Sequence, residues 1–202
     1  KNRKHEKVAP IVRLGILGST KGSDIVHIAE AIRSGFLNAS IETIITNNKN
    51  ALILEKAKTY GINSCFINHK NKTREAFDKE ITEKLKEKNV DLILLIGFMR
   101  ILSKEFVSGW EGKIINVHPS LLPKYAGGMN NDVHRRGLDA KDKEKGCTIH
   151  VVTKDIDKGP VLVQKKCPVF RHDTVASLKK RVQKLEGEAF VEAIKKIGLS
   201  NE

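Results

Sequence analysis

The sequence predicts an α/β protein with a doubly wound, mostly parallel sheet, and two observations support that prediction. Short apolar runs typical of buried strands alternate along the chain with longer segments that have the period of a helix. A turn with two glycines, Gly18 and Gly22, follows the first apolar run and leads into a helix. Strands that alternate with helices at this pitch form parallel sheets with right-handed crossovers.

The first half of the chain is expected to contain four strands and three helices. Thr73 can cap the third helix, in which Phe77, Ile81 and Leu85 repeat every four residues on one face. The strands are expected at residues 11–17, 40–46, 62–66 and 90–96. The helices are expected at residues 23–34, 51–60 and 74–88.

The second half is expected to close the sheet. A short helix at residues 104–108 precedes a central strand that starts near residue 113. Two further strands, at residues 146–153 and 161–169, are joined by a turn and followed by a long helix at residues 173–197. We expect residues 11–198 to form one domain and residues 1–10 to form a basic, mobile tail.

Composition restricts the class of protein. A chain of 202 residues with 40% hydrophobic content can bury a core, and no apolar run reaches the ~18 residues of a membrane span. The charged N-terminus lacks the apolar segment of a signal peptide, so we expect a soluble, cytoplasmic protein. Cys65, Cys147 and Cys167 form no C-x-x-C pair, so we expect small buried side chains rather than disulfides or a metal site.

The formal net charge of +13 would attract polyanions, from phosphorylated metabolites to RNA. The charge runs near the N-terminus and in the last helix are typical of solvated faces. Aromatic residues make up 5% of the chain, and no stacking platform for bases is evident. We therefore expect no nucleic-acid partner, although an RNA-binding module without chemistry is the alternative from a different class.

The segment from Lys113 to Pro123 carries the strongest functional signal. Asn116 and His118 are two residues apart, so in an extended strand their side chains point to the same side. Pro119 and Pro123 stiffen the loop that follows, and we expect the Leu122–Pro123 bond to be cis. Rigid polar groups at the carboxyl end of a strand are typical of ligand sites in open α/β sheets. The alternative is a strand end whose Asn and His only satisfy loop backbone groups.

A second candidate is the turn after the first strand. Gly22 permits a close approach of the backbone, and Ser23 and Asp24 open a helix whose free N–H groups can bind a phosphate. The spacing matches neither the dinucleotide fingerprint nor the Walker loop. A capped helix start without a ligand explains the same residues.

A third candidate is the turn between the two closing strands, where Asp155 and Asp157 stand two residues apart. Aspartate is also an ordinary turn residue, so the pair alone does not indicate a site. If the closing strands lie beside the central strand, one of these carboxylates can reach His118. That geometry would place an amide, an imidazole and a carboxylate in one cleft.

Five segments carry a further signal: Gly22–Asp24, Gly97–Ser103, Asn116–Tyr125, Gly146–His150 and Asp157–Pro160. Together they resemble the successive motifs of the phosphoribosylglycinamide formyltransferase family, which is folate-dependent and has a Rossmann-like fold. The resemblance extends from about Val12 to Ala193, and the Asn-x-His-Pro-Ser-Leu-Leu-Pro motif with its later Asp is specific for folate-dependent formyltransferases and their hydrolase relatives. It implies formyl transfer from 10-formyltetrahydrofolate to the amine of phosphoribosylglycinamide in purine synthesis, with no metal.

The resemblance also implies roles for individual residues. The catalytic residues are Asn116, His118 and Asp157. The groups that bind the ribotide are Gly22, Ser23, Asp24, Gln183 and Glu186. The groups that bind the folate are Arg74, Met99, Arg100, Ile101, Leu102, Asn116, Val152 and Asp155.

The chemistry expected of the catalytic residues follows from an amine that attacks a formyl carbon. Asn116 and a protonated His118 would stabilise the tetrahedral oxyanion, and Asp157 would raise the pKa of His118. Small molecules are the only partners expected, and both a monomer and a homodimer remain open. The alternatives within the fold are a formyltetrahydrofolate hydrolase or another formyltransferase, which are expected to carry an additional domain.

Two positions depart from the family pattern. Asp24 stands where the family usually has Asn, which would place a carboxylate near the phosphate. The segment from Ala126 to Val133 is about three residues longer than usual, and we expect it to form a loop over the active site.

Overall fold

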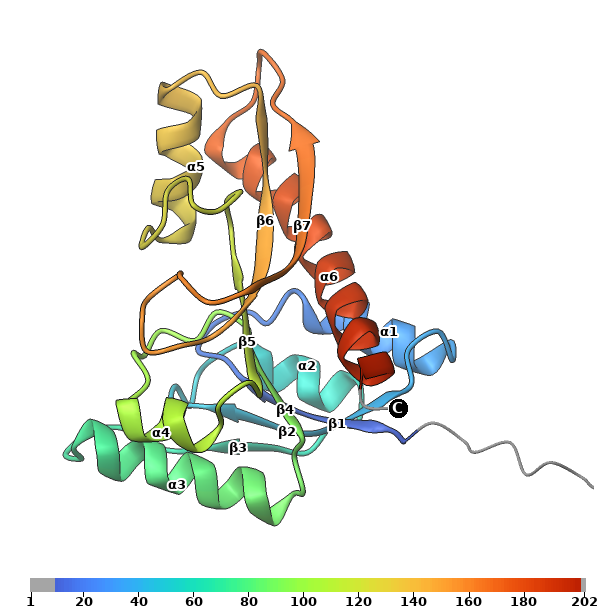
Figure 1. Cartoon of the computed structure of the whole chain (residues 1–202), viewed down its shortest axis with the longest axis vertical. Helices are drawn as coiled ribbons and strands as arrows, with labels where there is room; N and C mark the ends of the chain where they lie inside the picture. The colour runs from blue at the N-terminus through green and yellow to red at the C-terminus, as the bar shows by residue number, and fades with distance from the viewer. Residues whose placement is uncertain (1–9, 201–202) are drawn as a thin grey trace, which may run out of the picture.

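The computed structural model describes residues 10–200, so the predicted tail lies outside the described residues except for Pro10. A seven-stranded sheet forms the centre of the molecule, with the strand order β3-β2-β1-β4-β5-β6-β7 (Figure 1). Strands β1 to β5 are parallel, whereas β6 is antiparallel to both β5 and β7. The strands are β1 Val12–Leu17, β2 Ala39–Thr46, β3 Ser64–Phe66, β4 Leu92–Leu95, β5 Ile114–His118, β6 Glu144–Val151 and β7 Val161–Pro168.

Helices cover both faces of this sheet, which confirms the predicted doubly wound, mostly parallel α/β fold. Successive β5 residues show the two faces, because Ile115 belongs to one hydrophobic cluster and Ile114 to the other. Helices α1, α2 and α6 pack on the first cluster, and α3 and α4 on the second (Figure 1). The helices are α1 Ile25–Arg33, α2 Ile53–Thr59, α3 Arg74–Glu87, α4 Lys104–Gly109, α5 Asn130–Asp139 and α6 Val175–Ser200.

Helix α3 forms as its sequence predicts. The Thr73 hydroxyl accepts a hydrogen bond from the Ala76 N–H at 3.1 Å, which satisfies one of the free donors of the first turn. Phe77, Ile81 and Leu85 are fully buried on the side that faces the sheet. The predicted apolar face and cap of this helix are both confirmed.

Helix α5 corrects the expectation that residues 126–133 form a loop. The loop ends at Met129, and Asn130 begins a helix that runs to Asp139. Within this helix Val133, His134 and Gly137 are buried, and the helix packs beside α6. Its sequence is mostly polar and has no side-chain cap, so the helix depends on tertiary contacts that local propensity does not report.

The cysteines and the helix lengths test two further expectations. Cys147 and Cys167 are free and buried, as predicted, whereas Cys65 is only half-buried because it lies in the short edge strand β3. Within residues 10–200, no helix has both the length and the apolar content needed to cross a membrane.

Candidate active site

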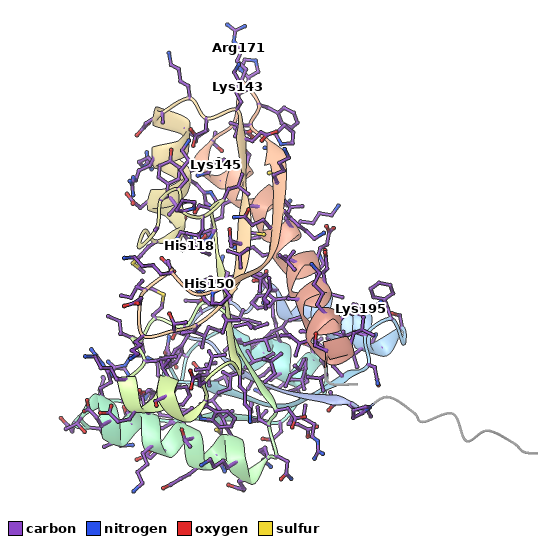
Figure 2. All side chains as sticks on the ribbon, viewed as in Figure 1. His118, Lys143, Lys145, His150, Arg171 and Lys195 are labelled. Atoms are coloured by element: carbon purple, nitrogen blue, oxygen red, sulfur yellow. The ribbon has the colours of Figure 1, made fainter. Side chains whose placement is uncertain are left out.

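Asn116 and His118 lie at the end of β5, and strand β6 and the β6–β7 loop bring further side chains to the same place. Strand β6 runs antiparallel to β5 in a register that places His150 opposite Asn116. The loop between β6 and β7 crosses β5 in Figure 1 and carries Asp157. Figure 2 shows His118 and His150 one above the other along these two strands.

Asp157 lies between the two histidines. Its carboxylate oxygens are 3.4 Å from His118 Nε2 and 3.6 Å from His150 Nε2, and its side chain is only 9% exposed. The Gly127 N–H donates a hydrogen bond of 2.6 Å to the same carboxylate and fixes its position. The structure therefore brings Asn116, His118 and Asp157 to one place, while their catalytic role stays a prediction.

The hydrogen bonds around His118 define which of its nitrogens carries a proton. The Ser120 hydroxyl donates to the carbonyl oxygen of Lys124, so the same hydroxyl oxygen must accept from His118 Nδ1 at 2.8 Å. Nδ1 is therefore protonated, and in the neutral ring Nε2 is a bare acceptor. This Nε2 is buried and has no hydrogen-bond partner.

His150 has the same tautomer for a similar reason. Its Nδ1 lies 3.3 Å from the Val151 carbonyl, which can only accept, so Nδ1 is the donor. The bare Nε2 then accepts from the Asn116 amide at 3.2 Å. An amide has two N–H donors, so Asn116 is oriented by His150 and keeps one donor for a ligand.

Burial lowers the pKa of both rings. Removal from water lowers the pKa of His118 below its usual range, and the carboxylate of Asp157 only partly opposes this effect. Burial lowers the pKa of His150 in the same way. Asp157 therefore raises the pKa of His118, as predicted, although desolvation of the ring is the larger effect and the net shift is downward.

The loop after β5 is held rigidly. The Leu122–Pro123 bond is cis, as predicted. The buried Thr148 hydroxyl donates to the Ser120 carbonyl at 2.7 Å and accepts from the Leu122 N–H at 3.0 Å. Thr148 of β6 and Ser120 thus satisfy the backbone of this loop. The side chains of Asn116 and His118 bond to other side chains instead, and His118 Nε2 and one Asn116 donor remain available.

Residues 12–194 match the family model described as formyl transferase. The chain belongs to this family. This finding confirms the family and the fold that the sequence motifs predict.

The formyl transferase relatives fall into two groups by length. The chain is 38% identical over 172 residues to the phosphoribosylglycinamide formyltransferase of Escherichia coli, which covers 85% of this chain and 80% of that protein. It is 40% identical over 185 residues to the trifunctional purine biosynthetic protein adenosine-3 of Drosophila melanogaster, which covers 90% of this chain. The match takes in 14% of that longer protein.

Solved structures show the same formyl transferase fold. The phosphoribosylglycinamide formyltransferase of Coxiella burnetii superposes with a TM-score of 0.88 at 35% identity, covering 95% of this chain and 89% of that one. The corresponding structure from Anaplasma phagocytophilum has a TM-score of 0.85 at 36% identity, with coverages of 95% and 89%.

The predicted ribotide residues of this formyl transferase lie at the start of α1 and in α6, and Asp24 and Glu186 join the two parts. Gly22 has a φ of 65°, and a side chain there would meet Ile53 at 2.6 Å, so the position requires glycine. Ser23 is half-buried, and Asp24 is the N-cap residue of α1. Asp24 is in contact with Glu186, a buried residue of α6. That helix supplies the last members of the predicted set, Gln183 and Glu186.

The Asp24 carboxylate is turned toward α6. It is only 3% exposed and faces Glu186, which is 5% exposed, while its expected place near a bound phosphate stays a prediction. The start of α1 therefore presents backbone rather than an open carboxylate. Gln183 lies one turn before Glu186 and is half-buried.

The predicted folate residues gather on the other side of the sheet. The Arg100 guanidinium lies 5.4 Å from the centre of the Phe77 ring, and its buried Nε has no hydrogen-bond partner. Met99 and Ile101 are 54% and 60% exposed, so apolar surface flanks this donor. This combination fits a flat heterocycle with polar edges. Leu102 and Val152 are packed on the α3–α4 cluster.

Two further members of the predicted folate set are exposed. Arg74 is the exposed first residue of α3. Asp155 is exposed at the surface of the β6–β7 loop, where its N–H donates to the Thr153 hydroxyl at 3.3 Å. A hydrogen bond of 2.9 Å from the Met99 N–H to Ser19 Oγ joins the loops that follow β4 and β1.

His150 is a side chain of this candidate site that the sequence analysis missed. It lies in the Gly146–His150 motif, yet no role was assigned to it. The signal is the strand register, because a residue two positions beyond Thr148 on an antiparallel neighbour of β5 faces the same side as His118. That signal becomes usable only when β6 is known to be the partner of β5.

Proposed function

We propose that this protein is a phosphoribosylglycinamide formyltransferase that uses 10-formyltetrahydrofolate as the formyl donor in purine biosynthesis. The printed names of the Escherichia coli and Coxiella burnetii relatives support this substrate pair, since both proteins match the chain over most of their length. The single observation that carries the chemistry is the bare, buried Nε2 of His118 beside the carboxylate of Asp157.

The first step forms a bond between the ribotide amine and the formyl carbon. The carbonyl oxygen gains negative charge, and the free N–H of Asn116 donates a hydrogen bond to it. Loss of one such donor costs about 10²-fold or more in comparable acyl-transfer enzymes. His150 contributes indirectly because its Nε2 fixes the orientation of this amide.

The attacking amine must lose a proton, and the neutral ring of His118 can accept it. His118 Nε2 takes it, and the imidazolium that forms lies 3.4 Å from the Asp157 carboxylate. The pair then carries opposite charges in a site with little water, where their attraction is strong. His118 next returns the proton to the departing folate nitrogen as the tetrahedral carbon collapses, so the ring ends neutral as it began.

Binding of the two substrates is divided between the two sides of the sheet. The backbone at Gly22 and Ser23 would hold the phosphate at the start of α1, and the Glu186 carboxylate can accept hydrogen bonds from ribose hydroxyls. Arg100 would donate to the folate ring between Met99 and Ile101. We place this reaction of small molecules in the cytoplasm, without a membrane or nucleic-acid partner.

A formyl-transfer assay tests the proposal. The purified chain is mixed with 10-formyltetrahydrofolate, with and without phosphoribosylglycinamide, and both formylated ribotide and released formate are measured. We expect formylated ribotide only with the acceptor and little formate without it. Release of formate that is independent of the acceptor would support the hydrolase alternative and overturn the proposal.

A further inference from the structure

Two buried carboxyl groups from different helices meet behind the predicted phosphate loop. Asp24 at the start of α1 is 3% exposed, and Glu186 in α6 is 5% exposed. Their side chains are hydrogen-bonded to each other, while Asp24 Oδ1 is buried without a hydrogen-bond partner. In the proposed mechanism Glu186 accepts hydrogen bonds from the ribose hydroxyls, whereas Asp24 has no role.

The surroundings of this pair supply little positive charge. On α1, His27 packs against Gly187 and its Nδ1 is buried without a hydrogen-bond partner. On β6, burial raises the pKa of the Cys147 thiol, so that side chain is neutral. On β7, Lys165 is bound to Glu192 at 2.8 Å.

Lys179 is the cation of α6 that faces the pair. It lies two turns before Glu186 and lowers the pKa of that group, but its effect is smaller than the effects of burial and of Asp24. Burial raises the pKa of Asp24 to about 7 and holds that of Glu186 well above its usual range. Two carboxylates in contact, away from water, cannot both ionise without a large cost.

We propose that Asp24 and Glu186 share one proton and that the ribotide binds only to the protein that holds it. The proposal rests on the proposed function for the identity of the ligand. With the shared proton, the pair carries one negative charge and Glu186 can accept from the ribose. Without it, two adjacent charges repel each other and the phosphate dianion at the start of α1.

The consequence is a specific pH dependence of ribotide binding. If binding requires one proton on the pair, the KM for the ribotide rises about tenfold per pH unit once the pair has lost that proton. Asp24→Asn keeps the size and the hydrogen bond to Glu186 but cannot lose a proton in this range. We therefore expect the ribotide KM of the Asn variant to lack this rise.

The first experiment measures ribotide KM between pH 6.5 and 9 for the wild type, Asp24→Asn and Asp139→Asn. The last is a matched control at an exposed carboxylate outside the site. The substrate amine also titrates near pH 8, so the ratio of wild-type to variant KM is compared. We expect this ratio to rise about tenfold per pH unit for Asp24→Asn and to stay constant for Asp139→Asn. A constant ratio for both overturns the coupling of ribotide to the proton.

The second experiment needs no substrate and separates this inference from the proposed function. The Tm is measured from pH 4.5 to 8.5 for the wild type, Asp24→Asn and Glu186→Gln. A raised pKa in the folded protein stabilises it at low pH, and this stabilisation is lost as the pH rises through about 7. We expect each variant to lose much of this pH dependence, and identical curves would overturn proton sharing. Absence of turnover in all variants would contradict the proposed function, and the Tm curves would still decide whether a proton is shared.

Discussion

Asp157 lies beside an imidazole nitrogen of each of two histidines, and its charge favours a proton on either ring. The distances of 3.4 and 3.6 Å allow the carboxylate to stabilise an imidazolium on either side. In the proposed mechanism, His118 receives the proton that leaves the attacking amine, and Asp157 stabilises the imidazolium that forms. The charge appears only during the reaction, so its stabilisation contributes to the rate more than to substrate binding.

The first prediction at this scale concerns Asp157→Asn. The variant keeps the shape of the side chain but removes the charge that stabilises protonated His118. We expect kcat for formyl transfer to fall about 10²-fold or more, while the ribotide KM changes less than about threefold. Steady-state kinetics with both substrates checks this.

Asp155→Asn is the matched control, because its carboxylate is exposed two residues away in the same loop. We expect this variant to keep most of the wild-type kcat. If Asp155→Asn proved the more damaging change, the acid–base role would belong to Asp155 and the assignment of Asp157 would be wrong.

At the scale of elements, the loop between β6 and β7 must hold Asp157 in place, and Gly159 is the residue that permits its path. A Cβ at this position would lie 1.6 Å from the Val151 carbonyl oxygen, which belongs to the backbone and cannot move aside easily. The Val151 N–H also donates to the Pro160 carbonyl at 2.9 Å and closes the base of the loop.

We expect Gly159→Ala to shift this loop and to lower kcat about 10²-fold, since a displacement near 1 Å at a reacting group has effects of that size. Gly109→Ala is the control, because a Cβ there meets nothing within 4 Å. Its kcat should match the wild type. Full activity of Gly159→Ala would show that this contact does not position Asp157.

The start of α6 supplies a stability prediction. The Asp173 carboxylate, whose side chain is 4% exposed, accepts hydrogen bonds of 2.7 and 2.9 Å from Arg181. It also accepts from the Phe170 N–H at 2.6 Å. These partners hold the pKa of Asp173 well below its usual value of 3.8.

Asp173→Asn should lower the free energy of unfolding by about 1–2 kcal/mol at pH 7, measured with urea. A depressed pKa gives stabilisation that is present above pH 3.8 and lost as the pH falls toward the folded-state value, so the difference should shrink in acid. Asp132→Asn removes an exposed ion pair with Arg136 and should cost less than about 0.5 kcal/mol. Equal costs at pH 7 would contradict the role given to Asp173.

The elements also show what could be predicted from the sequence. Helix α3 was predictable because its cap and its buried face are local patterns around Thr73 and Phe77. Helix α5 was not, since its stability comes from packing beside α6 rather than from its polar sequence. The sequence analysis expected a carboxylate of the β6–β7 turn to reach His118 only if the closing strands lay beside β5, and Asp157 does so. His150 was missed because the antiparallel register of β6 with β5 cannot be read from the sequence.

For the whole molecule, the two faces of the sheet serve different substrates in this proposal. The α1–α6 side carries Asp24 and Glu186, whereas the α3–α4 side carries Arg100 over the Phe77 ring. Of the predicted catalytic residues, Asn116 and His118 lie at the end of β5, and Asp157 reaches them from the β6–β7 loop. Each hydrophobic cluster therefore supports one binding surface as well as the fold.

A pair of core substitutions tests this division. Phe77 and Phe190 are both fully buried, one in each cluster. Phe77→Leu removes the ring beneath Arg100, and Phe190→Leu loosens α6 one turn after Glu186. Each should lower the free energy of unfolding by about 1–3 kcal/mol, so the two variants control for each other's loss of stability.

The two variants should raise the KM values of different substrates, although their losses of stability are similar. We expect Phe77→Leu to raise the KM for 10-formyltetrahydrofolate several-fold and to leave the ribotide KM nearly unchanged, because the Arg100 donor loses its support while α6 is untouched. Phe190→Leu should do the reverse, since coupling between side chains on opposite faces of the sheet is weak when they share no contacts. If each variant raised both KM values by the same factor, the two faces would not act as separate supports, and substrate binding would depend on the stability of the molecule as a whole.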